Sequence, residues 1–225
     1  MTDLSSVVVT LKLAASATVV LMVISIPLAW WLAVTHSRIK PFVEALTALP
    51  LVLPPTVFGF YLLILFNPQF PIGAFWLRMS GDTLAFSFSG ILVATVLHSL
   101  PFVVQPLQNS FENVGKGEIE AAAVLGAHPL DIFASVTAPL AKRGFLTAAV
   151  LGFAHSVGEF GVILMVGGNI PERTRVISID IYTSVETLDY ARAHLLSLGT
   201  LIFAFVTLLT LYLINFGRSG RNRAF

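Results

Sequence analysis

Five apolar stretches, each long enough to cross a lipid bilayer, constrain this chain more than any other feature. A membrane-spanning helix needs about 20 apolar residues. Only 11% of the 225 residues are charged, whereas soluble domains carry roughly 25%. A helix also satisfies its own backbone hydrogen bonds in hydrocarbon. The sequence therefore predicts an all-α integral membrane protein, a single domain over residues 1–225, with five transmembrane helices at about 13–34, 42–66, 84–107, 144–166 and 195–216.

The distribution of basic residues predicts how these spans are oriented. Residues 67–83 are expected to form an outer loop with a short interfacial helix, and residues 167–193 an outer helix that lies on the bundle. An excess of Lys and Arg marks the cytoplasmic side of a membrane. The richer side holds Arg38, Lys40, Lys116, Lys142, Arg143, Arg218, Arg221 and Arg223, and the poorer side holds Lys12, Arg78, Arg173, Arg175 and Arg192. We therefore expect a multi-pass protein of the cytoplasmic membrane, with its N-terminus outside, its C-terminus inside and residues 112–143 inside.

The cytoplasmic segment 112–143 is predicted to fold as a helix, a tight turn and a short helix. Residues 118–125 are rich in alanine, which favours a helix. Gly126 suits the left-handed conformation that ends one, and Pro129 suits the first position of the next helix. That second helix, about nine residues long, is expected to end before Pro139. Because so short a helix is marginal alone in water, its apolar face should need a docking surface; that face consists of Ile132, Phe133 and Val136.

The spacing of this segment resembles the EAA loop of permease subunits in ABC importers, where such a subunit contacts its ATPase. The resemblance assigns ATPase coupling to Glu120, Ala121, Ala122, Gly126, Pro129, Ile132, Phe133, Val136 and Pro139. Members of that family usually carry Ile and Leu at the positions of Val136 and Ala138, so the match is close and not complete. The alternative is an ordinary cytoplasmic helical hairpin.

Three further segments resemble the molybdate/tungstate permeases within that family. Residues 49–55 read LPLVLPP, residues 155–161 read HSVGEFG, and residues 169–175 read NIPERTR. The first two resemble the family's LPLVLPP and SxGEFG segments, and the third its outer loop. Chain length and the LPLVLPP segment favour molybdate over the alternative, a sulfate/thiosulfate permease, and molybdate cannot be separated from tungstate. The resemblance implies that Arg173 and Arg175 are candidates for docking an external binding protein.

Polar and helix-breaking residues inside the predicted spans are candidates for the transport path. A proline inside a helix removes a hydrogen bond, and interrupted helices often mark the substrate path of a transporter. Histidine and serine side chains in a span can line a path, although they more often bond a neighbouring helix. The candidate pathway or gate residues are Pro54, Pro55, Thr56, His98, Ser99, His155 and Ser156.

Glu159 is the most informative single residue within the predicted spans, because an acidic side chain in a span is costly unless it is paired or hydrated. A carboxylate is a poor ligand for an anion, so we expect a structural role, shared with Gly158 and Gly161 beside it. The expected partners are Arg173, Arg175 or nearby backbone N–H groups. A role in gating is the alternative.

The sequence also indicates which partners and cofactors to expect. No GxxxxGK[ST] sequence is present, so ATP and Mg²⁺ are expected on a partner ATPase and no cofactor or metal in this chain. The expected partners are a second copy, two ATP-binding cassette subunits, an external oxyanion-binding protein and the lipid bilayer. A net charge of +1 argues against nucleic acid. An intramembrane enzyme remains a weaker alternative, because His155 and Glu159 share a helix face but no HExxH sequence is present.

Overall fold

The structure is a computed structural model that describes residues 4–219, and within that range its regular elements are all helical. In chain order they are α1 (Ser5–Val34), α2 (Lys40–Val52), α3 (Pro55–Phe66), α4 (Pro71–Ser80), α5 (Phe88–Glu112), α6 (Lys116–Val124), α7 (Pro129–Ile132), the π-helical η1 (Phe133–Thr137), α8 (Ala138–Leu140), α9 (Lys142–Gly158), α10 (Gly161–Gly167), α11 (Ile177–Glu186) and α12 (Tyr190–Ser219).

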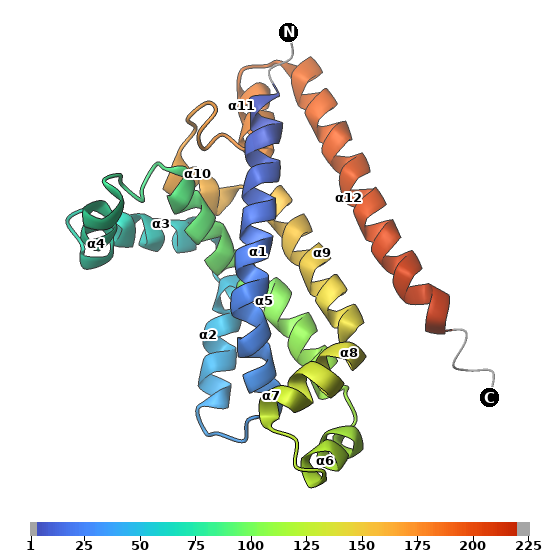
Figure 1. Ribbon diagram of the computed structural model, residues 1–225. Helices are drawn as coiled ribbons and strands as arrows, with labels where there is room; N and C mark the ends of the chain where they lie inside the picture. Colours follow the sequence, from blue (N-terminus) through green and yellow to red (C-terminus); the bar gives the residue numbers. More distant parts are fainter. Residues whose placement is uncertain (1–3, 220–225) are drawn as a thin grey trace.

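The long helices α1, α5 and α9 pack together as the central bundle (Figure 1). Leu21, Leu107 and Ala148 are among the side chains fully buried between them. Gly152 of α9 allows a close approach, because a Cβ atom there would lie 2.6 Å from Cγ2 of Val103. Small residues at such crossings improve van der Waals packing, which drives helix association in lipid. The bundle therefore links the two ends of the molecule as one packed body.

Three of the five predicted spans are continuous helices and two are bent pairs. The helices α1, α5 and residues Tyr190–Ile214 of α12 are each long and apolar enough to cross a membrane. The helices α2 and α3 bend by 112° at a short break, and α9 and α10 bend by 61°. The count of five spans holds if each bent pair is taken as one span. The interruption that the prolines predict in the span at 42–66 is present, whereas the span at 144–166, expected as one helix, is corrected to a broken one.

Local backbone chemistry explains the first break. Leu53 and Pro54 are extended, with ψ of 135° and 134°, and Pro55 then begins α3. Neither proline has an N–H to continue the ladder of α2. At the second break, Glu159 is also extended, with ψ of 133°, and Gly161 begins α10. Non-helical backbone at membrane depth is tolerated where protein buries it or where it lines a water-filled cavity.

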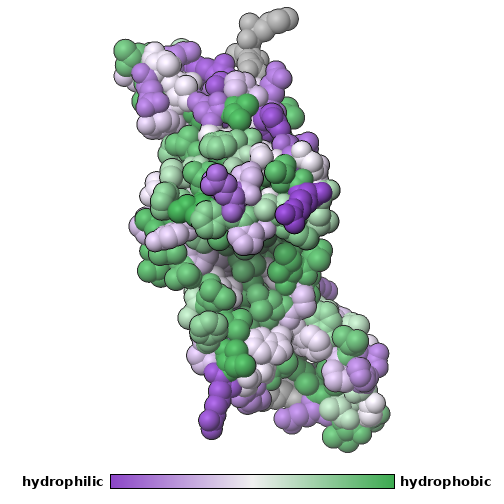
Figure 2. All heavy atoms as spheres, turned by 90° about the vertical axis from the view of Figure 1, so that its left-hand side faces the viewer, coloured by the Kyte–Doolittle hydropathy of each residue, from purple (hydrophilic) through white to green (hydrophobic). Residues whose placement is uncertain are grey.

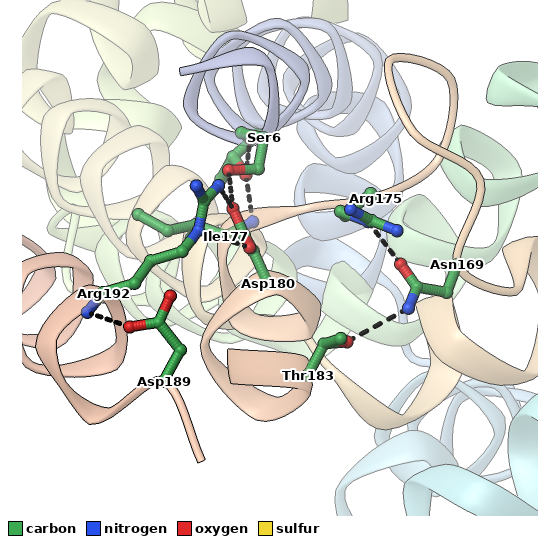
Figure 3. A network of polar contacts seen from close by, with 9 residues as sticks. Ser6, Asn169, Arg175, Ile177, Asp180, Thr183, Asp189 and Arg192 are labelled. Atoms are coloured by element: carbon green, nitrogen blue, oxygen red, sulfur yellow. Dashed lines mark hydrogen bonds and ion pairs between the residues drawn. The ribbon is translucent and has the colours of Figure 1, made fainter. Parts of the chain in front are cut away.

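A polar network at the end where the chain starts ties α1 to α11 and α12 (Figure 3). Ser6 Oγ donates to Asp180 Oδ2 at 2.6 Å, and Thr10 Oγ1 accepts from the Ile177 N–H at 2.8 Å. Arg192 reaches the same carboxylate through Nε at 3.1 Å and Nη2 at 2.8 Å. Burial raises the pKa of Asp180, but the hydrogen bonds from Arg192 and Ser6 outweigh it and hold that pKa below its usual value. The helix expected within 167–193 is confirmed as α11.

The helix α12 stands apart from the bundle along most of its length (Figure 1). Only 6% of its most apolar window is buried within the chain. Figure 2 shows another face, where apolar side chains cover much of the middle, hydrophilic ones gather toward the two ends, and a few hydrophilic side chains interrupt the apolar area above its centre. The short helix expected within 67–83 is present as α4. The N-terminal end of α1 and the segment α6 to α8 lie at opposite ends of the molecule, as an odd number of crossings requires (Figure 1).

Candidate functional site

The two broken spans meet at their breaks. A Cβ atom on Gly161, at the start of α10, would lie 2.9 Å from Cβ of Pro55, at the start of α3. Beyond this contact α3 packs along α10, where Leu62 and Phe66 share a buried cluster with Val162. The LPLVLPP and HSVGEFG segments, about a hundred residues apart in sequence, are therefore neighbours in space. Glycine at position 161 allows these two segments of the chain to come this close.

Glu159 lies at this meeting point and its side chain is only 4% exposed. Its Oε2 lies 2.7 Å from Nδ1 of His98, which α5 supplies. Ser178 Oγ donates to the backbone carbonyl of Glu159, which fixes the extended residue against α11. Since a carboxylate in a span is costly without partners, the bond to His98 offsets much of that cost. It also joins α5 to the break between α9 and α10.

A second histidine, His155, lies beside this pair. We call His98, His155 and Glu159 the histidine–glutamate cluster. Nδ1 of His155 lies 3.8 Å from Oε2 of Glu159 and 2.9 Å from Oγ of Ser99. The Phe102 ring stacks on His155 with centroids 3.8 Å apart. One potential ligand atom from each of His98, His155 and Glu159 lies within 4.8 Å of the other two. This arrangement can exchange protons or hold a small cation, and its hydrogen-bond donors can contact an oxyanion.

The candidate pathway residues fall into two groups. His98, Ser99 and His155 are brought together in the cluster, and Pro54, Pro55 and Thr56 are exposed at the neighbouring break. Ser156 does not join either group. It is 1% exposed, and its hydroxyl donates to the Gly152 carbonyl one turn back, so its one proton is used inside its own helix.

The expected pairing of Glu159 with Arg173 or Arg175 is wrong. Arg173 Nη2 donates to Asp82 at 3.3 Å, and Arg175 Nε donates to Asn169 at 2.5 Å. Both arginines follow α10, which carries the chain one further helix away from the break. Sequence spacing revealed His155 as a neighbour of Glu159, but it could not reveal His98, because 61 residues separate that histidine from its partner.

The loop segment at the opposite end has the predicted helix, turn and helix. Gly126 has φ of +84°, which confirms its left-handed conformation. Its N–H donates to the Ala123 carbonyl at 3.0 Å, and the N–H of Ala127 donates to the Ala122 carbonyl at 3.1 Å. These are the two hydrogen bonds of a Schellman motif, which ends a helix at a left-handed residue. The turn between α6 and α7 is therefore set by local backbone geometry.

The second helix of this segment differs from its predicted form in length. It continues from α7 through η1 and α8 to Leu140, so Pro139 lies inside it and does not end it. In η1 the Ala138 N–H donates to the Phe133 carbonyl, five residues back. The helix continues through this wider turn to Pro139. Proline has no N–H, so no hydrogen-bond donor is left without a partner at that position. The helix ends at Ala141.

The predicted apolar docking face also points differently. Phe133 is half-buried and packs against this chain's own bundle, with its ring centroid 4.8 Å from that of Trp30 and 5.8 Å from that of Phe111, so the predicted docking face is turned in part toward the bundle. Ile132 and Val136 are half-buried beside it, and Glu120 and Ala121 are exposed. The exposed apolar surface lies at the turn instead, where Val124 is 88%, Leu125 86% and Leu130 64% exposed. We call these three residues the turn surface.

Comparison with known proteins places the chain among transport permeases. A family model described as "binding-protein-dependent transport system inner membrane component" matches residues 25–219. The molybdenum transport system permease protein ModB of Azotobacter vinelandii is 54% identical over 210 residues, which cover 93% of this chain and 93% of that protein. ModB of Haemophilus influenzae is 32% identical over 82% of this chain and 81% of its own. The probable sulfate transport system permease protein cysT of Zygnema circumcarinatum is 33% identical over 98% and 76%.

The family model covers most of the described residues, including both breaks, the histidine–glutamate cluster and the turn surface. The strong match to the Azotobacter protein extends over almost the whole of both chains. The chain therefore belongs to the family of binding-protein-dependent transport system inner membrane components.

Proposed function

We propose that this chain is the permease subunit of an ABC importer and forms a translocation path for molybdate or tungstate. The observation that carries the proposal is the Gly126 turn with its exposed apolar turn surface, held by the bundle at the end opposite the start of α1. Exposed Val124 and Leu125 in a polar loop are costly unless a partner covers them. A partner ATPase that binds ATP and Mg²⁺ fits this surface, while the permease itself performs no chemistry.

The transported anion is inferred from the names of related permeases. Two of the proteins named above are described as molybdenum permeases, and the one at 54% identity is of this kind. The described sulfate permease, at 33% identity, is more distant than the Azotobacter protein at 54% and about as similar as the Haemophilus ModB at 32%. Sulfate is therefore the second candidate. Molybdate and tungstate are tetrahedral dianions of nearly equal size, so one path should carry both.

The proposed assembly contains two copies of the chain, two ATPases and an external binding protein. Closed twofold dimers are the commonest assemblies of identical chains. The turn surface would face the cytoplasm, with the N-terminus outside and the C-terminus inside. Residues 1–3 and 220–225 lie outside the described range, so these positions are inferred from α1 and α12. ATP binding would draw the ATPases together and shift the path by a rigid-body movement.

The proposed path runs beside the two breaks. Pro54, Pro55 and Thr56 would border it, and His98, Ser99 and His155 would supply hydrogen-bond donors behind them. Such contacts should be weak, since a path must release what it conducts. Glu159 would position the histidines and not touch the anion, with Gly158 and Gly161 leaving room at the bend.

Arg173 and Arg175 are proposed to meet the binding protein. The side chain of Arg173 is 58% exposed beside Asp82, so it remains available to a partner. Rim charges act mainly on association rate and its salt dependence. Replacing both arginines by Gln should slow uptake at low concentrations of binding protein and leave it unchanged at saturation; equal uptake at every concentration would exclude this role.

The function is tested by uptake into liposomes that contain the chain and its co-expressed ATPase, with the binding protein outside. We expect ATP-dependent molybdate uptake that an equal concentration of tungstate halves and that sulfate leaves almost unchanged. Competition by sulfate as strong as that by tungstate would favour the sulfate assignment. No ATP-dependent uptake of any of the three oxyanions would contradict the proposal.

Two glycines test whether the turn transmits the movement. Neither Gly126 nor Gly117 has an atom within 4 Å of an added Cβ atom, but only Gly126 has a positive φ. A left-handed conformation costs an L-residue about 1–2 kcal/mol, and a β-branched residue fits it worst. Gly126→Val should therefore reduce co-purification of the ATPase and its stimulation by loaded binding protein, whereas Gly117→Val should retain both. Full coupling in Gly126→Val would show that the turn is not the transmission element.

A second pair of variants separates docking from folding. Leu125→Ser removes apolar area from the turn surface and touches no core residue, so it should lower ATPase affinity without changing the unfolding temperature. Phe133→Ala removes the packing on Trp30 and Phe111 and should destabilise the chain by about 3 kcal/mol or less. ATPase pull-down and thermal unfolding in detergent measure the two effects. The account fails here if Leu125→Ser binds the ATPase normally while Phe133→Ala loses it at unchanged stability.

A further inference from the structure

The histidine–glutamate cluster has a donor set that the transport of an anion does not require. Two imidazole nitrogens and one carboxylate oxygen lie within 4.8 Å of one another. Two histidines and a glutamate are an established protein ligand set for Zn²⁺, with a fourth position left for water. The chain has no cysteine, so no thiolate competes for such an ion. We propose that His98, His155 and Glu159 form a Zn²⁺ site that fastens α5 to the break between α9 and α10.

The distances suit this ion after small movements. Metal–ligand distances of about 2.0–2.2 Å place the ligand atoms of a tetrahedral site roughly 3.4 Å apart. Here Oε2 of Glu159 is 2.7 Å from Nδ1 of His98 and 3.8 Å from Nδ1 of His155. The first pair must open by less than 1 Å, and the second must close by about half of that. The two histidine nitrogens, which lie within 4.8 Å of each other, must close by up to about 1.4 Å to reach that spacing. His155 Nδ1 must also exchange its contact with Ser99 Oγ for the ion. The proton between His98 and Glu159 leaves to solvent when Zn²⁺ takes its place.

The surroundings hold the ligands in place and leave one of them accessible. The Phe102 ring stacks on His155, the Phe58 ring lies 5.5 Å from that of His98, and Ser178 holds the backbone of Glu159. Packing of this kind reduces the rotamer freedom that binding must otherwise remove. The His155 side chain is 21% exposed, against 9% for His98 and 4% for Glu159. It is therefore the most exposed of the three ligands.

A bound ion would have a mechanical consequence. The ligands come from α5, from the last turn of α9 and from the extended residue at the bend. Zn²⁺ would therefore join the bundle to both halves of a broken span at the point where that span can change its angle. We expect it to slow any movement of the bend. The proposal does not depend on the nature of the transported anion, and direct binding measurements test it apart from uptake.

The test is a calorimetric titration of the purified chain with Zn²⁺, after treatment with chelator and without a histidine tag. We expect one equivalent per chain, and a Kd at least tenfold weaker in His155→Ala and in Glu159→Gln. His36 and His194 are exposed and serve as matched controls, so His36→Ala and His194→Ala should bind as the unchanged chain does. Co²⁺ in place of Zn²⁺ should give the visible absorption of a tetrahedral site, which the two cluster variants should lose.

Thermal unfolding guards against a variant that fails to fold. Glu159→Gln keeps the shape of the side chain, and His155 is the least buried ligand, so at least one variant should unfold near the normal temperature without metal. Zn²⁺ should raise the unfolding temperature of the unchanged chain and not that of the folded variant. Weak binding of several equivalents that falls with His36→Ala or His194→Ala, or unaltered binding in both cluster variants, would overturn the proposal.

Discussion

Hydrocarbon offers no hydrogen bonds to an interrupted helix, and this constraint governs the rest of the structure. Each break exposes backbone groups and one carries a carboxylate, so each needs partners from elsewhere in the chain. In the structure the two breaks lie together, where Gly161 packs against Pro55 and Glu159 bonds His98. The packing of α3 on α10 and the contact of α5 with the bend both follow from that meeting.

Packed helices connect the histidine–glutamate cluster to the turn surface at the other end of the molecule. The bundle of α1, α5 and α9 runs from the cluster at the bend to the segment that contains the turn surface. Phe133 fastens that segment to the bundle through Trp30 and Phe111, so a push on the turn reaches packed helices directly. The turn itself is fixed by two backbone hydrogen bonds around Gly126. A turn held by backbone hydrogen bonds and joined to packed helices is suited to the transmission of movement that we propose.

Sequence reasoning succeeded where local rules decide and failed where distant contacts do. The left-handed Gly126 and the helices beside it follow from backbone preferences within a few residues. The partner of Glu159 does not, because His98 reaches it only through the packing of α5 on α9. Phe133 was assigned to an outer face because helix periodicity shows that residues share a face, but not which way that face points. Pro139 lies inside the helix because a wide π-helical turn precedes it, and no local sequence pattern predicts that turn.

The most direct test of the account is the accessibility of Thr56 at the meeting point, because the chain contains no cysteine. A cysteine at Thr56 should react with a charged, membrane-impermeant thiol reagent several-fold faster in one of two states, nucleotide-free or ATP-trapped, as the path opens to alternate sides. A cysteine at Phe205, exposed on α12, should react slowly in both states because it faces lipid. Equal, slow reaction at Thr56 in both states would place the breaks against lipid and contradict a transport path at this site.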